Sequence, residues 1–217
     1  MPPTLPSPPA RSWFPQGDGR IPGFGTVTTV NPLAEGWEPP ATPEGGRLVL
    51  YSGWLGEQAG PGLWTSSFRT WGPTGRDAFD RLTARLSEAE SMFCFRPHAR
   101  HVLADPQTCL SFLRAHESDG PDSRGSWGFG VLLDPVAMLT PDMLDQAEDH
   151  LRRAFGALGD RPDVPALLLT NAELVETTDS KELRACPLDA GVLNAEMIRT
   201  LAAEFWPADK PVFGLDT

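Results

Sequence analysis

The chain has 217 residues, 40% of them hydrophobic, and a formal net charge of -11 from 18 basic and 29 acidic side chains. This length is enough for one domain with a sizeable core. The acidic balance argues against nucleic acid and against anionic membranes as partners, because both need a basic surface. The sequence contains no run of 18 apolar residues, so no membrane span is predicted. Residues 1–13 lack the basic start and the apolar stretch of a secretory signal, so we expect none.

The three cysteines, Cys94, Cys109 and Cys186, stand far apart and form no CxxC pair. An odd and sparse set of cysteines is typical of reduced thiols, so we expect a cytoplasmic protein in which they are small buried residues. The sequence contains no P-loop, GxSxG or HExxH string, so NTPase, hydrolase and zinc-protease functions have no motif in their favour.

Proline dominates the first part of the chain, since residues 1–46 hold 11 of the 23 prolines. Proline removes a backbone donor and fixes φ, so this segment favours neither a helix nor a central strand. We expect an irregular, proline-rich arm over residues 1–46 and a folded domain over residues 47–217. One stretch of the arm, Gly25–Val30, is rich in β-branched residues and is predicted to form an edge strand.

From residue 47 onward, short apolar runs alternate with segments of helical periodicity. Apolar runs of this length are typical of parallel strands that are covered on both faces. Helix starts are indicated at Asp105, Thr140 and Asn194, and the first two are followed by proline. Alternating strands and helices predict parallel strands joined by helical crossovers. The predicted strands cover residues 48–54, 92–95, 129–133, 166–169 and 212–215.

Five strings in this part of the chain carry a resemblance to a known family. They are FCFRPH at residues 93–98, VLLDPVA at 131–137, LLTN at 168–171, PLDAGVLN at 187–194 and VFGLD at 212–216. In this order they resemble the last strands and a late loop of the xylose isomerase-like TIM barrels, which include sugar phosphate isomerases and epimerases. The resemblance implies an α/β fold, a partial or distorted TIM (β/α) barrel of about five parallel strand–helix units. The number of predicted strands leaves an open five-stranded sheet as an alternative.

The chain departs from the family pattern at the positions that hold metal. Arg96 stands where the family has Glu, and Ala137 and Leu168 stand where it has His. The resemblance implies a divalent metal (Mn, Zn, Co or Mg), but its ligands are largely absent, with Asp134 and Asp216 as weak candidates. An arginine also repels a cation, so we expect the inherited metal site to be lost.

Several polar and aromatic side chains are predicted to lie at the carboxyl ends of the strands, where barrels place their function. Arg96 is predicted either to pair with Asp134 across the barrel mouth or to hold a phosphate or carboxylate. Trp54 is predicted either to stack on a sugar ring or to cover the mouth. The candidate catalytic residues are Asp134 and His98, and the candidate substrate-binding residues are Arg96, His101, Asn171 and Trp54.

The first three strands of the family have no clear counterpart in residues 1–46. An open barrel would expose strand edges and part of its apolar interior. Three remedies stay open: the arm wraps the opening, two chains close on each other, or the sequence is a shortened gene product of marginal stability.

The predicted function is that of a sugar phosphate isomerase/epimerase-like protein with a degraded metal site and weak or no isomerase activity. One alternative is a non-catalytic protein that binds a sugar or an anionic small molecule through Arg96, His98 and Asp134. Another is a structural partner, such as one chain of a homo-oligomer, that completes its barrel with a second chain. The substrate stays open, because fold-level resemblance does not fix function.

Overall fold

The structure is a computed structural model that describes residues 12–41, 47–56, 58–60, 62–64, 68–89, 91–117, 128–176 and 181–215. The strands are β1 (Ser12–Phe14), β2 (Gly19–Ile21), β3 (Gly25–Thr28), β4 (Arg47–Tyr51), β5 (Gln58–Gly60), β6 (Leu63–Trp64), β7 (Met92–Arg96), β8 (Phe129–Leu133), β9 (Ala166–Glu176), β10 (Lys181–Pro187) and β11 (Val212–Leu215). The helices are α1 (Phe68–Trp71), α2 (Pro73–Leu86), α3 (Pro106–Ala115), α4 (Ala147–Leu158) and α5 (Ala195–Phe205), with short 3₁₀ helices η1 (Val136–Met138), η2 (Pro141–Gln146) and η3 (Leu188–Ala190).

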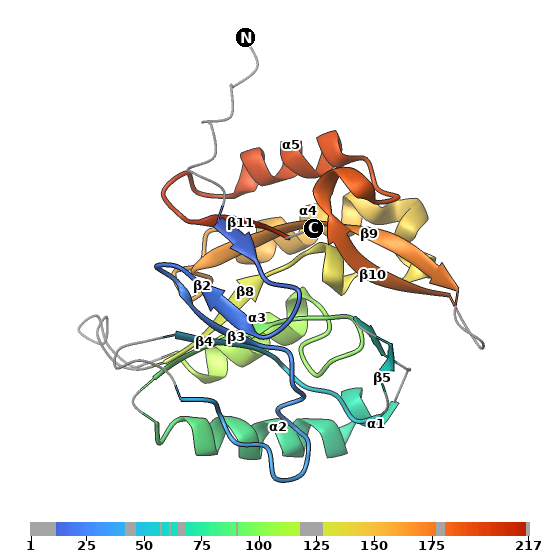
Figure 1. Cartoon of the computed structure of the whole chain (residues 1–217). Coiled ribbons are helices and arrows are strands. Elements are labelled where there is room, and N and C mark those ends of the chain that lie inside the picture. Colours follow the sequence, from blue (N-terminus) through green and yellow to red (C-terminus); the bar gives the residue numbers. More distant parts are fainter. Residues whose placement is uncertain are drawn as a thin grey trace.

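Parallel strands form one curled sheet in the order β1-β11-β9-β8-β7-β4-β3 (Figure 1). Strand β2 is antiparallel and pairs with β3, while β10 returns antiparallel along β9. With β2 added beside β3, the sheet begins with β1 and ends with β2. These two strands follow each other in the chain and contact each other. The sheet therefore curls back toward its own beginning, and the predicted partial (β/α) barrel is confirmed.

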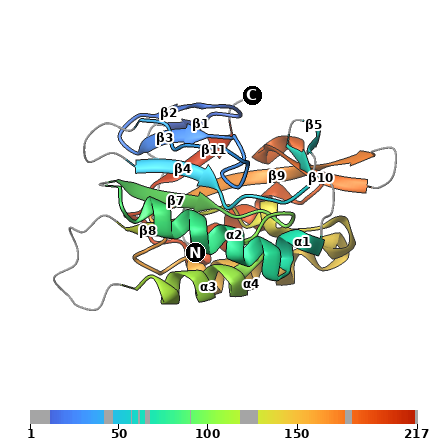
Figure 2. The same cartoon turned by 90° about the horizontal axis from the view of Figure 1, so that it is seen from below.

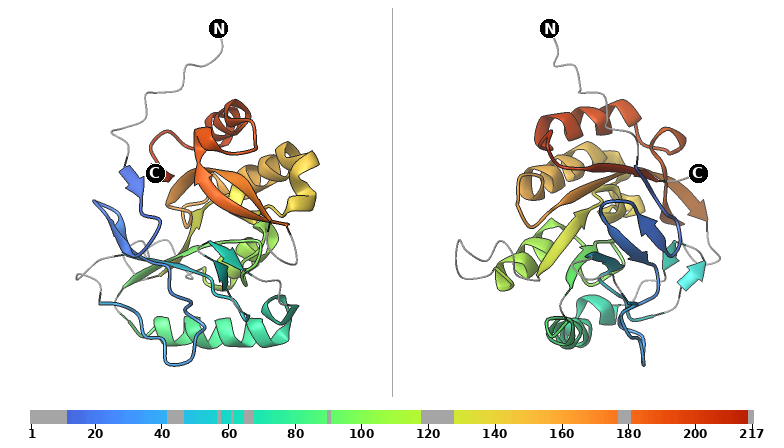
Figure 3. Two further views of the ribbon diagram at one scale, coloured as in Figure 1. Left: turned by 45° about the vertical axis from the view of Figure 1, so that its right-hand side comes forward. Right: turned by 60° about the vertical axis from the view of Figure 1, so that its left-hand side comes forward.

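Helices α2 to α5 lie along the outer side of the curled sheet, as Figures 2 and 3 show. They connect successive parallel strands, as a barrel requires: α2 precedes β7, α3 precedes β8, α4 precedes β9 and α5 precedes β11. Among the described residues, no helix has both the length and the apolar character that a membrane span needs.

Alternate residues of the strands point to two different cores, because side chains alternate across a strand. Leu48, Phe95 and Leu133 face the helices and join the large outer cluster. The inner cluster draws on every strand of the curled sheet, and its members are Phe14, Ile21, Val27, Val49, Cys94, Leu132, Ala166, Leu168, Phe213 and Leu215. The interior is thus a packed core rather than an open channel.

The structure contains all five strands that the apolar runs predicted. Strand β9 is longer than predicted and extends to Glu176, and its hairpin partner β10 was not predicted. The helix start at Asp105 is confirmed, since its side chain accepts a hydrogen bond from the Thr108 backbone N–H in a capping box. The predicted cap at Asn194 is also confirmed. Thr140 opens the 3₁₀ helix η2 instead of an α-helix.

The prediction of an irregular arm is wrong for Ser12–Phe14 and Gly19–Ile21, which form β1 and β2 of the same sheet as the rest of the chain, whereas the strand predicted at Gly25–Val30 is present as β3. Strand β3 was expected at the edge but lies between β4 and β2. Gly25 allows this close pairing, because a Cβ there would lie 2.4 Å from the carbonyl oxygen of Arg47. The expected remedy in which the arm wraps the opening is therefore the one the fold adopts.

Phe14 tests whether β1 belongs to the barrel wall. Its ring is 1% exposed within the inner cluster, so Phe14→Ala should lower the free energy of unfolding by about 3 kcal/mol. Urea denaturation measures this loss. Val192→Ala, at a residue that is 56% exposed, is the control and should change the value by less than about 0.5 kcal/mol. Equal, small effects of the two substitutions would show that β1 is not part of the cooperative unit.

Candidate functional site

Arg96 and Asp134 lie at the carboxyl ends of two neighbouring parallel strands. Arg96 is the last residue of β7, and Asp134 directly follows β8. Each lies two positions beyond a residue of the inner cluster, Cys94 and Leu132 respectively, so both side chains point into the barrel. The sequence thus brings a cation and an anion together at the mouth of the barrel.

A buried ion pair joins these two residues. The Nε and Nη2 atoms of Arg96 donate to Oδ2 of Asp134 at 3.0 and 2.7 Å. The other carboxylate oxygen, Oδ1, accepts from the Thr170 hydroxyl at 2.9 Å and from the Ala137 backbone N–H at 3.3 Å. Asp134 is fully buried and Arg96 nearly so. The predicted pairing across the mouth is confirmed.

Aromatic rings surround the rest of the Arg96 guanidinium. Its Nη1 atom donates to the hydroxyl of Tyr51 at 3.1 Å. Its Cζ atom lies 5.2 Å from the ring centroid of Phe14 and 5.3 Å from that of Tyr51. Burial alone would lower the pKa of Arg96, but the contacts with Tyr51 and Asp134 raise it above the ordinary value. The arginine is therefore a fixed positive charge.

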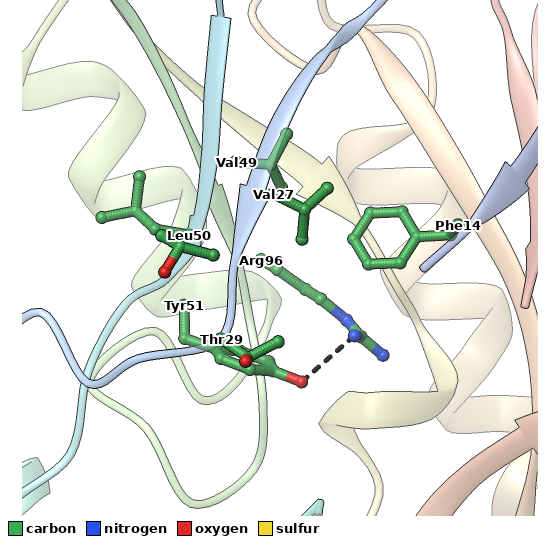
Figure 4. A pocket seen from close by; sticks show the side chains of 8 residues that line it. Phe14, Val27, Thr29, Val49, Leu50, Tyr51 and Arg96 are labelled. Carbon is green, nitrogen blue, oxygen red and sulfur yellow. Dashed lines mark hydrogen bonds between the residues drawn. The ribbon is translucent and has the colours of Figure 1, made fainter. Parts of the chain in front are cut away.

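A small pocket opens beside this guanidinium (Figure 4). The volume of about 170 Å³ includes space that opens to solvent, and the enclosed room fits about one water molecule. The lining combines apolar side chains from the barrel interior with Thr29, the Tyr51 hydroxyl and Arg96 at the rim, and its residues are Phe14, Val27, Thr28, Thr29, Val49, Leu50, Tyr51 and Arg96. Asp18 fixes the rim, because it accepts hydrogen bonds from the backbone N–H and hydroxyl of Thr29.

The loop after β7 holds both candidate histidines and is bonded to the neighbouring loops. The backbone N–H of Leu103 donates to the Ser52 hydroxyl, and that of Ala99 donates to the Ala137 carbonyl. Nδ1 of His98 accepts from the backbone N–H of Arg100 at 3.1 Å, which fixes this nitrogen in its unprotonated form. The loop is thus a rigid cover on the barrel mouth.

Both histidines are held neutral. Burial, followed by the positive charges of Arg96 and Arg100, lowers the pKa of His98 to about 3. Burial, with His98 and Arg96 nearby, also brings the pKa of His101 well below its ordinary value. A general base works best when its pKa lies near the operating pH, so these environments disfavour His98 in the predicted catalytic role.

Trp54 covers the mouth by packing on His101. The two rings are stacked with centroids 4.9 Å apart, and the Tyr51 ring meets His101 edge-on at 4.8 Å. Trp54 is 7% exposed and His101 is fully buried. Of the two roles expected for Trp54, the structure supports covering the mouth. The substrate-binding role predicted for His101 has no support from its position within this cluster.

Asn171 holds a loop in place. Its amide nitrogen donates to the carbonyls of Leu188 and Leu193, and its oxygen accepts from the backbone N–H of Leu193. Gly191 makes room for this amide, because a Cβ there would lie 2.2 Å from Oδ1 of Asn171. The amide that was predicted to bind substrate is therefore used to fix the loop between β10 and α5.

The hairpin β9–β10 adds a second ion pair above the mouth. Arg100 donates through Nε and Nη2 to the carboxylate of Glu182 on β10, at distances of 3.0 to 3.1 Å. Both side chains are largely buried. This contact ties the loop after β7 to β10 and closes the mouth on that side.

The residues at the mouth do not fit a divalent metal. Both oxygens of Asp134 accept hydrogen bonds from protein donors, and the Arg96 guanidinium occupies the space beside them. Within the described ranges, no three side chains of the types His, Cys, Asp and Glu gather in a way that could hold a metal ion. The second predicted ligand, Asp216, lies outside the described residues.

The sequence reasoning missed three residues of the site, namely Phe14, Tyr51 and Thr170. Tyr51 is the one tyrosine of the chain and lies within a predicted strand, so the inward alternation of β4 was a signal for it. Phe14 comes from a three-residue strand in the proline-rich segment, where no local pattern marks a site. Thr170 belongs to the string LLTN, where attention went to the asparagine that follows it.

Among the comparisons with known proteins, the search of solved structures finds a partial likeness. No family model matches the chain, and no curated protein matches it. A crystal structure of a xylose isomerase-like TIM barrel protein from Mycobacterium smegmatis, in complex with magnesium, is similar with a TM-score of 0.45 and 12% sequence identity. The match covers 79% of this chain and 55% of that one, so this chain spans about half of the other protein. By itself, a likeness of this size decides neither family nor activity.

Breaking the central ion pair should be costly. Arg96→Met leaves the buried Asp134 carboxylate without its cation and should lower the free energy of unfolding by about 3–5 kcal/mol in urea denaturation. The double variant Arg96→Met/Asp134→Leu should recover most of that loss, because no charge is left buried. Arg152→Met, which removes an exposed pair with Glu204, is the matched control and should leave the unfolding midpoint nearly unchanged. If Arg96→Met were as stable as the control Arg152→Met, the stabilising role assigned to the pair of Arg96 and Asp134 would be wrong.

The lowered pKa of His98 predicts acid sensitivity. Below the ordinary histidine pKa of 6.5, His98 is protonated in the unfolded chain. In the folded chain it stays neutral until the pH falls to about 3. Stability is therefore fully present above pH 6.5 and falls on acidification, by about 1 kcal/mol per pH unit from this group. His98→Asn keeps an acceptor for the Arg100 N–H and should reduce that slope. Denaturation curves at several pH values measure it, and an unchanged slope in the variant would refute the assignment.

Proposed function

We propose that the chain is a metal-independent, non-catalytic binding protein built on a partial (β/α) barrel of the sugar phosphate isomerase kind. The observation that carries this proposal is the buried pair of Arg96 and Asp134 at the mouth of the barrel. In the family that the sequence resembles, this end of the barrel carries the metal and the catalytic carboxylates. Here a permanent cation and its counter-ion take that place.

The arrangement offers little to isomerase chemistry. Moving a proton between two carbons needs a free base and a group that polarises the substrate oxygen. Asp134 is saturated with hydrogen bonds, and His98 is neutral with one nitrogen already engaged. This set of contacts supports the absence of isomerase activity.

The same arrangement favours binding. Three of the five N–H groups of Arg96 are engaged with Asp134 and Tyr51, and the side chain of Arg96 lines the small pocket together with Thr29 and Tyr51. Buried guanidinium groups make strong, directional hydrogen bonds to acceptor oxygens. The ligand class that we propose is therefore a sugar or another small oxygen-bearing molecule.

The curled sheet also bears on the alternative of a structural partner. A second chain was one of three arrangements that the sequence left open for filling the barrel. In the structure β1 and β2 lie at this opening, contact each other and contribute Phe14 and Ile21 to the inner cluster. Closure of the barrel therefore gives no reason to require a second copy. Homo-oligomerisation through another surface stays a prediction, as does a cytoplasmic location.

A metal titration tests the proposal directly. Thermal unfolding of the purified chain is followed with Mn²⁺, Co²⁺, Zn²⁺ and Mg²⁺, and with EDTA. A metal that binds only the folded state, at 100 times its dissociation constant, would add about 2.7 kcal/mol of stability, a visible shift in Tm. We expect no saturable shift with any ion and no effect of EDTA. A saturable increase that disappears in Asp134→Asn would restore the metalloenzyme interpretation and overturn the proposal.

A further inference from the structure

Strand β1 closes the barrel wall with few backbone contacts. Its three residues pair with β11 alone among the described strands, whereas each of the other parallel strands has a paired neighbour on both sides. Strand β2 contacts β1 on its other side, but no register of paired residues joins the two within the described part of the chain. Segments with few backbone partners open at a lower free energy than the core does. The wall is therefore weakest at the seam between β1 and β2.

The chain is fixed again directly after this strand. The carboxylate of Asp18 accepts hydrogen bonds from the backbone N–H and the hydroxyl of Thr29, at 2.7 and 2.9 Å. Between β1 and Asp18 the loop is loosely packed, because a Cβ at Gly17 would meet no atom within 4 Å. Strand β1 can therefore leave the wall by a movement between Phe14 and Asp18, while β2 and β3 stay in place.

Phe14 covers the ion pair through its ring. The ring is 1% exposed, and its centroid lies 5.2 Å from Cζ of Arg96 (Figure 4). The described hydrogen bonds that support Arg96 and Asp134 come from other parts of the fold, namely Tyr51, Thr170 and Ala137. Removal of β1 would thus uncover the guanidinium and leave the polar network around it intact. What is lost is the burial of one aromatic ring and its contact with a cation.

We infer that β1 (Ser12–Phe14) is a displaceable strap, which leaves the wall while the rest of the barrel stays folded and opens the interior around Arg96. With the strap in place, the enclosed room beside Arg96 fits about one water molecule, so a ligand needs such an opening to reach this side chain. The inference goes beyond the proposed binding function, because it concerns access to the site and holds whatever the site binds. The open form is a minor conformation of the folded chain.

Two buried cysteines report the opening without any change to the chain. Cys94 belongs to the inner cluster together with Phe14, whereas Cys109 lies on α3 in the outer cluster, and both are 0% exposed. Burial raises the pKa of both thiols, so neither reacts before it is exposed to water. The folded protein is incubated with excess iodoacetamide at neutral pH. Peptide mass spectrometry then gives the rate of labelling at each cysteine.

We expect Cys94 to be labelled at least about tenfold faster than Cys109, because global unfolding exposes both thiols and opening of the strap exposes the inner one alone. Phe14→Leu should raise the Cys94 rate several-fold. The matched control Phe155→Leu, at a ring equally buried in the outer cluster, should leave the Cys94 rate nearly unchanged.

The comparison within the native chain keeps the test independent of how well the variants fold. Equal labelling rates at Cys94 and Cys109, or a Cys94 rate that rises equally in Phe14→Leu and Phe155→Leu, would show that the interior opens through global unfolding alone. Either result overturns the strap and leaves the binding function standing, since the metal titration tests that function separately.

Discussion

The ion pair between Arg96 and Asp134 is the interaction on which the site depends. Removing two charges from water costs several kcal/mol for each ion, and the pair is tolerable only because further donors satisfy it. Tyr51 takes one N–H of the guanidinium, while Thr170 and Ala137 donate to the second carboxylate oxygen. The contacts reach across four strands or their loops, so the pair fixes how the mouth of the barrel is assembled.

The barrel can enclose this pair because the proline-rich segment completes the wall. Strand β1 pairs with β11 and β3 pairs with β4, which brings Phe14 and Val27 into the same interior as Leu132 and Phe213. Phe14 then covers one side of the guanidinium. The segment that lacked clear strand patterning therefore supplies both the missing wall and part of the site's lining.

The loops above the mouth explain why the site is small. Trp54 stacks on His101 in the loop after β7, and the pair of Arg100 and Glu182 ties this loop to β10. These contacts exclude water and hold the histidines neutral, since a buried imidazolium beside Arg96 would be strongly disfavoured. What is left open is the narrow pocket between β1, β3 and β4. The same packing that stabilises the mouth thus leaves little open space there.

The sequence by itself determined the five apolar strands from residue 48 onward, the helix cap at Asp105, and the presence of Arg96 and Asp134 at adjacent strand ends. These features are local, because burial on both faces and helix capping are encoded by neighbouring residues. Only the tertiary structure decided that β1 pairs with β11 and that β3 pairs with β4. It also decided the presence of β10 and the roles of Tyr51 and Phe14. A three-residue strand such as β1 is stabilised by a partner that is distant in the chain, so no local pattern indicates it. The use of Asn171 to fix a loop, and the neutrality of His98, likewise follow from packing that the sequence does not display.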